Sequence, residues 1–179
     1  MARKIGRYIS ISGLDLAVIR MNIVIKEAEE KHVIFCVNIL QNTGLGTIYF
    51  SNYQKAADLL LHALAQRELF VALKDDDDCL GFMYYMPKGV FGSYPYLHIV
   101  AVKEEYRNLG IGKQLIKYFE ENSSDYSSTK YFLTVDDFNQ QARKLYESLG
   151  YQCVGKLKDF YKSGITSYIM MKATNNNSK

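Results

Sequence analysis

The sequence has no tryptophan, only three cysteines and no long apolar run, and the last two shortages exclude classes of protein. Without tryptophan, an aromatic surface depends largely on fifteen tyrosines, whose hydroxyl groups need hydrogen-bond partners. No apolar stretch approaches the roughly 20 residues that cross a bilayer. The opening MARKIGRY lacks the apolar segment that follows the charges of a signal peptide. We therefore expect a cytoplasmic protein that does not associate with membranes.

The cysteines, Cys36, Cys79 and Cys153, are far apart in the sequence. They form no CxxC motif and no cluster with histidine, so neither a zinc site nor a disulfide framework is indicated. We expect reduced and mostly buried thiols, and no metal.

The net charge of +3 comes entirely from the start of the chain. The first twenty residues carry Arg3, Lys4, Arg7 and Arg20 against Asp15, and the rest of the chain is neutral. A nucleic-acid-binding protein needs a basic face on the fold itself, so no nucleic-acid partner is predicted.

The apolar pattern predicts one domain over residues 21–173, between an N-terminal extension (1–20), for which flexible chain is one interpretation, and a disordered tail (174–179). Strands are expected at 22–28, 69–73, 80–86, 96–102, 131–135, 151–157 and 167–172, and helices at 29–40, 54–65, 111–121 and 139–149. Residues 42–53 are expected to be a loop. The four aspartates at 75–78 repel one another and predict a solvated hairpin tip. This order indicates an α/β protein with a mixed sheet and helices on its faces.

The stretch LHIVAVKEEYRNLGIGKQLI carries the first functional motif. A strand ends at Val102, and Gly110 and Gly112 open a helix whose N–H groups and dipole attract anions. Arg107 precedes them and could add its side chain or N–H. Leu115 and Gln114 exclude a Rossmann fingerprint and a Walker A loop, respectively. From this motif alone, the alternative that the glycines merely permit a tight turn stays open.

The second motif is TVDDFNQQARKLYESLGY, in which Asn139 begins a helix, Ala142 and Tyr146 share one face, and Gly150 caps its end. Together, V-x-x-x-x-R-x-x-G-x-G and N-x-x-A-x-x-x-Y-x-x-x-G-[FY] resemble the GNAT superfamily of N-acetyltransferases. The resemblance covers roughly residues 22–172 with both motifs in the right order.

The resemblance implies a GNAT-like fold in which two central parallel strands, 96–102 and 131–135, splay apart and admit the pantetheine arm of acetyl-CoA. It implies backbone contacts to pantetheine near Val100 and Val102, with a nearby N–H polarising the thioester carbonyl. Asn139 would bind the pantetheine or orient the thiol. The remaining cofactor-binding residues implied, which hold the pyrophosphate, are Arg107, Leu109, Gly110, Ile111, Gly112 and Lys113.

For catalysis, the resemblance implies that Tyr146 is the general acid, because a phenol with a pKa near 10 is protonated at neutral pH. The alternative is an aromatic core residue. His98 lies on the central strand, and an imidazole suits the base that deprotonates the amine. An ordered water could serve instead, and Glu104 and Glu105 are expected to be solvated.

The resemblance implies an acceptor pocket built by the first two helices, their connecting loop (42–53) and the last hairpin. The candidates are Tyr49, Phe50, Tyr53, Tyr84, Tyr85, Tyr94 and Tyr161. These aromatic residues could equally be core or homodimer contacts. Thr134 and Asp136 depart from the L-E-V-R-x-x-N pattern of ribosomal-protein acetyltransferases, so a small amine is preferred over a protein N-terminus or lysine. A non-catalytic acyl-CoA sensor or scaffold and a nucleotide-binding protein are the competing hypotheses.

Overall fold

The computed structural model describes residues 22–75, 78–123 and 130–174. The predicted extension at 1–20, the centre of the aspartate run and nearly all of the predicted tail lie outside the described residues.

The described elements are seven strands, five α-helices and one 3₁₀ helix, arranged as a mixed sheet with helices, which confirms the predicted fold class. The sheet has the order β1-β2-β3-β4-β5-β7-β6. The strands are β1 (Ile23–Glu27), β2 (Leu69–Lys74), β3 (Asp78–Val90), β4 (Tyr94–Val102), β5 (Lys130–Asp136), β6 (Gln152–Lys158) and β7 (Thr166–Ala173). The helices are α1 (Glu30–Gln41), α2 (Gly44–Tyr49), α3 (Tyr53–Ala65), η2 (Glu104–Tyr106), α4 (Ile111–Ser123) and α5 (Gln140–Ser148).

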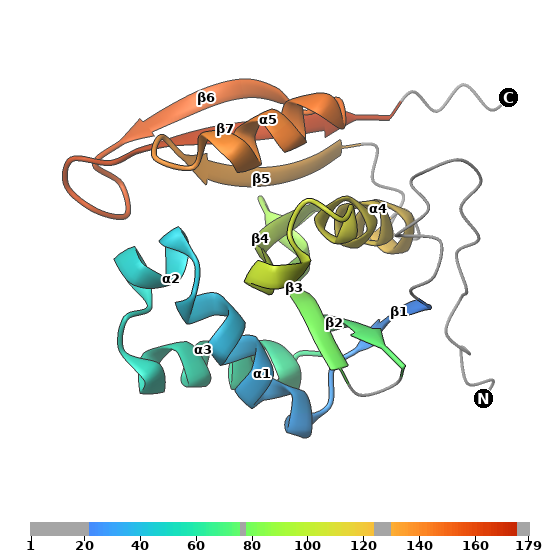
Figure 1. Ribbon diagram of the computed structural model, residues 1–179. Helices are drawn as coiled ribbons and strands as arrows, with labels where there is room; N and C mark the ends of the chain where they lie inside the picture. The colour runs from blue at the N-terminus through green and yellow to red at the C-terminus, as the bar shows by residue number, and fades with distance from the viewer. Residues whose placement is uncertain (1–21, 76–77, 124–129, 175–179) are drawn as a thin grey trace, which may run out of the picture. The chain divides into compact units, whose positions relative to one another are not determined.

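The described residues form two compact units, and the first contains those up to Tyr84 together with Ile99–Tyr118. In it, β1 and β2 pair antiparallel, and β2 continues to β3 with a β-bulge between Ala72 and Leu73. Helix α1 lies beside α3 (Figure 1). Cys36, Val37 and Leu40 of α1 are fully buried, as expected for an apolar stripe at helical spacing.

The second unit contains Tyr85–His98 and the chain from Phe119 onward. Strand β7 lies between β5 and β6 and pairs antiparallel with both. Strands β4 and β5 run parallel, in register at Tyr96↔Phe132 and Leu97↔Leu133. Helix α5 packs on β5 (Figure 1).

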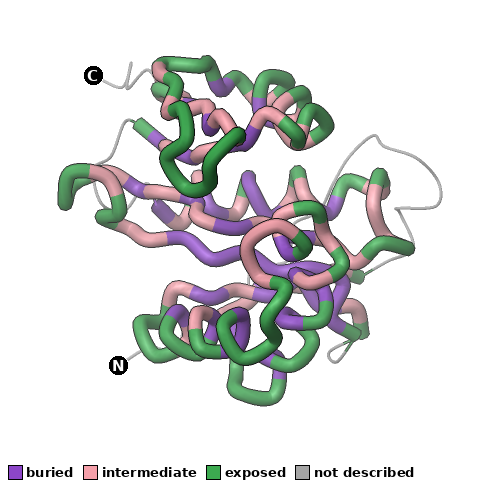
Figure 2. The backbone as a smooth tube through the Cα atoms, turned by 90° about the vertical axis from the view of Figure 1, so that its left-hand side faces the viewer, coloured by how far each residue is buried: buried purple, intermediate pink, exposed green. Residues whose placement is uncertain are grey.

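One-sided burial explains most of these elements. Figure 2 shows buried and exposed positions alternating along the helices. Along β4, Leu97, Ile99 and Ala101 are buried and the residues between them only half-buried. His98, Val100 and Val102 therefore share the more open face, as the two-residue alternation predicts.

The prediction of a loop over residues 42–53 was wrong, because α2 occupies half of it. The Thr43 side chain accepts a hydrogen bond from the N–H of Gly46 at 3.0 Å and caps this short helix. The glycines at 44 and 46 favoured a loop, but Gly46 packs against the backbone of Leu40 so closely that a Cβ would not fit. It is a packing residue within a helix.

Candidate active site

The turn between β4 and α4, in the first unit, has a backbone that suits an anion. After η2 the chain takes positive φ at Asn108 (63°) and again at Gly110 (83°). Nothing lies within 4 Å of the place where a Cβ on Gly110 would be, so the space in front of it is open. Glycine is required here by its conformation, and the open space gives a ligand access to the backbone.

Helix α4 supplies the donors of this turn. The first N–H groups of a helix have no carbonyl partner within it, so those of Ile111, Gly112 and Lys113 are available to an anion. The buried side chains of Ile111, Leu115 and Ile116 hold the helix in place. We call residues 107–113 the glycine turn.

Arg107 faces protein atoms. Its Nε donates to the carbonyl of Val102 at 3.2 Å, and its Nη2 donates to the carbonyl of Asn42 at 2.8 Å. The guanidinium therefore fastens the glycine turn to the end of β4 and to the residue that ends α1. Because a guanidinium has five N–H donors, this anchoring leaves others for a phosphate.

Tyr146, in the second unit, is positioned by both ends of α5. The Asn139 side chain accepts from the N–H of Ala142 at 3.2 Å and so caps the helix. At the other end Gly150 has φ 92°, and the N–H of Tyr151 donates to the carbonyl of Tyr146 at 3.0 Å, which confirms the predicted glycine cap. The Tyr146 side chain is only 6% exposed, and its ring meets Tyr151 edge to face.

Tyr96 has polar neighbours from three other segments, and one of them is Tyr146. The Tyr96 hydroxyl on β4 and Thr134 Oγ1 on β5 lie 2.7 Å apart in a hydrogen bond. Tyr96 also hydrogen-bonds Tyr161 of the β6–β7 connection and interacts electrostatically with Tyr146. We call Tyr96, Thr134, Tyr146 and Tyr161 the tyrosine cluster.

Burial fixes the protonation states in the cluster. It raises the pKa of Tyr146 and that of Tyr96 far above the ordinary value near 10, so both phenols carry their protons at neutral pH. The His98 ring lies 5.7 Å from that of Tyr96, and burial lowers its pKa. The site therefore combines phenolic proton donors with a neutral imidazole.

The structure divides the sequence-predicted residues between the units. Val100, Val102 and the glycine turn belong to the first unit; His98, Asn139 and Tyr146 belong to the second. Sequence reasoning missed Tyr96 and Thr134 as cluster members. Alternation along β4 was the available signal, since it places Tyr96 on the face of His98.

The acceptor candidates differ in exposure. Tyr84 and Tyr85 are at most 5% exposed, and the Tyr85 ring packs on Phe119, so they are core residues. Tyr53 and Tyr161 are nearly half exposed. Glu104 and Glu105 are exposed, as predicted.

Comparison with known proteins identifies the class. The model of the acetyltransferase (GNAT) family matches residues 35–151, which is most of the described chain. The chain belongs to this family, and the predicted resemblance is confirmed.

Two relatives match a shorter stretch. A thialysine N-epsilon-acetyltransferase of Sus scrofa is 37% identical over 70 residues, 39% of this chain and 41% of its own. An N-alpha-acetyltransferase of Saccharolobus solfataricus is 35% identical over 74 residues, which are 41% of this chain and 44% of its own. The match thus spans less than half of each of these relatives.

Solved structures share the fold across a wider span. A GNAT-family acetyltransferase of Bacillus cereus has a TM-score of 0.69 at 16% identity and covers 85% of this chain and 97% of its own. An aminoglycoside 6′-N-acetyltransferase complexed with coenzyme A also scores 0.69, at 20% identity, with 87% and 99% covered. No helix in the described part of the chain is long and apolar enough to cross a membrane.

Proposed function

We propose that the protein transfers the acetyl group of acetyl-CoA to a primary amine by direct attack. The observation that carries this proposal is the buried, protonated hydroxyl of Tyr146, at the position where the family motif has its general acid. A protein that only bound acyl-CoA would have no use for a positioned proton donor.

The donor is held by the glycine turn. The N–H groups of residues 110–113 bind the pyrophosphate, and the open space at Gly110 lets the phosphate approach the backbone. The aminoglycoside acetyltransferase of the same fold binds coenzyme A, which supports this donor. The peptide groups of Val100 and Val102 bind the pantetheine, and an N–H near Val100 polarises the thioester carbonyl.

The reaction needs one proton removed and one supplied. The amine arrives as ammonium and must lose a proton before its lone pair attacks the thioester carbon. His98, which burial keeps neutral, takes that proton directly or through a water. When the tetrahedral intermediate collapses, the C–S bond breaks and Tyr146 donates its proton to the departing thiolate.

The acceptor is an amino-acid-like small amine. The similarity to a thialysine acetyltransferase points to a side-chain amine of this kind. Asp136 stands where the ribosomal-protein pattern has arginine, and its carboxylate accepts a hydrogen bond from buried Ser167. Because this carboxylate is already engaged in a hydrogen bond within the protein, we rank a protein N-terminus below a small amine as the acceptor. The chain is nevertheless also similar to an N-alpha-acetyltransferase.

The test is a panel of primary amines mixed with acetyl-CoA, with release of free thiol as the readout. Lysine-like and diamine acceptors should release thiol, while secondary amides should not. Acetyl-CoA that raises the melting temperature without turnover on any amine would favour the acyl-CoA sensor instead. A larger thermal shift from ATP or NAD than from CoA would favour the nucleotide-binding alternative.

A further inference from the structure

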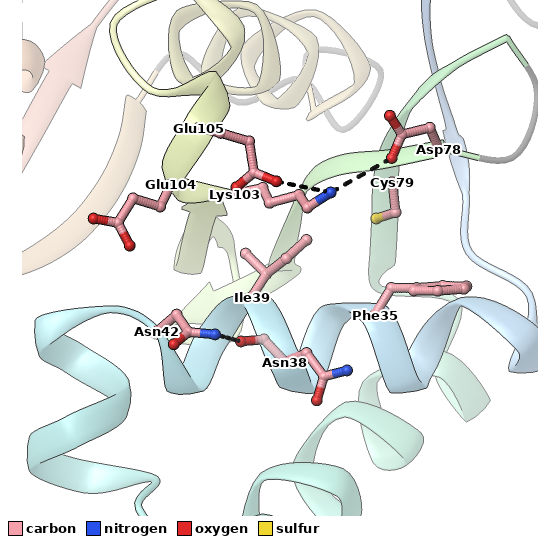
Figure 3. A pocket seen from close by; sticks show the side chains of 9 residues that line it. All are labelled: Phe35, Asn38, Ile39, Asn42, Asp78, Cys79, Lys103, Glu104 and Glu105. Carbon is pink, nitrogen blue, oxygen red and sulfur yellow. Dashed lines mark hydrogen bonds and ion pairs between the residues drawn. The ribbon is translucent and has the colours of Figure 1, made fainter.

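A pocket of about 370 Å³ lies within the first unit, and none of residues 107–113 of the glycine turn lines it. Its walls come from α1, the start of β3 and the segment that leads into η2 (Figure 3). Phe35 and Ile39 form an apolar side, and Asp78, Lys103 and Glu105 form a charged one. The Lys103 ammonium pairs with Glu105 at 3.0 Å and lies 3.8 Å from Asp78.

Cys79 lines this pocket and points into it above α1 (Figure 3). A β-bulge brings this about: Ala72 pairs with Gly81 but Leu73 pairs with Cys79, so Leu80 is an extra residue that re-aims its neighbours. The Cys79 side chain is 4% exposed, and the pocket is therefore its route to small molecules.

A second thiol meets Cys79 from the helix side. Cys36 is fully buried on the inner face of α1, and its thiol shares a hydrogen bond with that of Cys79. The two residues are 43 positions apart in the sequence, so no cysteine-spacing motif indicated the pair. Both are free thiols in this structure.

The surroundings make the two thiols unequal. The hydrogen bond from Cys36 lowers the pKa of Cys79 more than burial raises it, and the smaller effects of Asp78, which raises it, and Lys103, which lowers it, oppose each other. The same hydrogen bond, together with burial, raises the pKa of Cys36. Cys79 is therefore the thiol that ionises first and reacts, and Cys36 stays protonated during that step.

We propose that Cys36 and Cys79 are a redox-active dithiol that small neutral hydroperoxides oxidise to an intramolecular disulfide. The Cys79 thiolate attacks the peroxide, an S–O bond forms, the O–O bond breaks, and the departing oxygen takes up a proton as water or alcohol. The Cys36 sulfur then attacks the Cys79 sulfenic acid: an S–S bond forms, the S–O bond breaks, and water leaves with the proton of Cys36. The dithiol loses two electrons and the hydroperoxide gains them.

The pocket selects the oxidant. A hydrogen peroxide molecule is not much larger than a water molecule, which occupies about 30 Å³ in the liquid, so it enters easily. Three carboxylates, those of Asp78, Glu104 and Glu105, line the pocket against one lysine. This charge disfavours oxidised glutathione, which is anionic.

The experiment treats the reduced protein with hydrogen peroxide, blocks remaining thiols under denaturing conditions and maps the peptides by mass spectrometry. We expect a Cys36–Cys79 linked peptide in the wild type and equally in Cys153→Ser, which removes the exposed third thiol. Cys36→Ser should instead accumulate Cys79 sulfenic acid, trapped with dimedone. Full alkylation of Cys36 and Cys79 after peroxide, or linkage of either to Cys153, would overturn the proposal even if Cys36→Ser did not fold.

A second measurement tests the chemistry of the pocket. Lys103→Gln should slow the loss of the Cys79 thiol by about threefold, because a cation beside a thiol favours the thiolate. Lys55→Gln, an exposed lysine on α3, is the matched control and should leave the rate unchanged. Faster oxidation by glutathione disulfide than by peroxide at equal concentration would contradict the assigned oxidant.

Discussion

The glycine turn, our proposed site for the donor, offers backbone N–H groups, whereas the tyrosine cluster offers side-chain hydroxyl groups. In the turn, the conformation of Gly110 and the start of α4 expose the backbone N–H groups, and the Arg107 side chain donates to the carbonyls of Val102 and Asn42. In the cluster, hydroxyls from β4, β5, α5 and the β6–β7 connection meet. The first region should therefore be sensitive to changes of backbone freedom, and the second to the loss of single hydroxyl groups.

This difference also separates binding from chemistry. Backbone N–H groups at a helix start hold an anion at every stage of a reaction, so they contribute to ground-state affinity. A buried phenol changes the energy of a step in which a proton moves. Mutations in the two regions should consequently divide between the dissociation constant of acetyl-CoA and kcat.

The largest effect is expected for Tyr146→Phe. Removal of the hydroxyl should lower kcat by about 10- to 100-fold, the range of a lost general acid, and leave the KM for acetyl-CoA within about twofold. Steady-state thiol release measures both. Tyr151→Phe is the matched control, since Tyr151 is another buried tyrosine in ring contact with Tyr146. Equal losses in the two variants would mean that Tyr146 is a core residue only.

Gly110→Ala tests the other side of the comparison. An alanine at φ 83° costs about 1–2 kcal/mol in the left-handed region, and the turn should relax away from it. We expect the dissociation constant of CoA, measured by calorimetry, to rise about tenfold, with kcat at saturating acetyl-CoA little changed.

Gly92→Ala is the control for strain alone. Gly92 has φ 65° and nothing within 4 Å of its Cβ position, but it lies in the β3–β4 connection. The Gly92→Ala variant should have a lower melting temperature but should bind CoA as tightly as the wild type. If both variants bound CoA equally well, the glycine turn would not be the pyrophosphate site.

Prediction from sequence succeeded where one local rule decides the structure. The bounds of α1, α3 and α4 follow from apolar spacing to within about two residues. Asn139 and Gly150 capped α5 as expected because caps depend on neighbours in sequence.

Prediction failed where distant residues decide. Gly46 belongs to a helix because its missing side chain lets α2 approach Leu40, a contact that local turn statistics cannot contain. The Tyr96–Thr134 bond joins residues 38 apart, and the Cys36–Cys79 pair joins a helix to a strand. Such contacts depend on register and bulges, which are set by the assembled sheet.

A smaller effect is expected for His98→Gln. If His98 relays the amine proton, kcat/KM at pH 7 should fall about fivefold and the acid limb of its pH profile should flatten. Exposed His62→Gln on α3 is the control. An unchanged profile would assign the proton to a water chain instead.

Stability gives an independent check on His98. Because burial lowers its pKa, the unfolded chain takes up a proton before the folded protein does as the pH falls below about 6.5. This contribution to stability is therefore complete above that pH and is lost on the way down to the lowered pKa. Chemical denaturation between pH 7 and pH 5 should show a shallower loss in His98→Gln than in the wild type.

The smallest effect concerns the bond between Tyr96 and Thr134. Tyr96→Phe and Thr134→Val should each lower the free energy of unfolding by about 1 kcal/mol, because each leaves one half-buried hydroxyl without this partner. The double variant should lose less than the sum of the two, since no orphaned hydroxyl of that pair remains. Urea denaturation of the four proteins of this cycle measures the coupling.

The same bond also has a kinetic test. If it orients Tyr146 through Tyr96, kcat should fall about twofold in Tyr96→Phe while the affinity for CoA stays constant. This is the opposite of the pattern expected for Gly110→Ala. If the losses in stability were additive and kcat were unchanged, Tyr146 would be the one residue of the cluster with a role in catalysis.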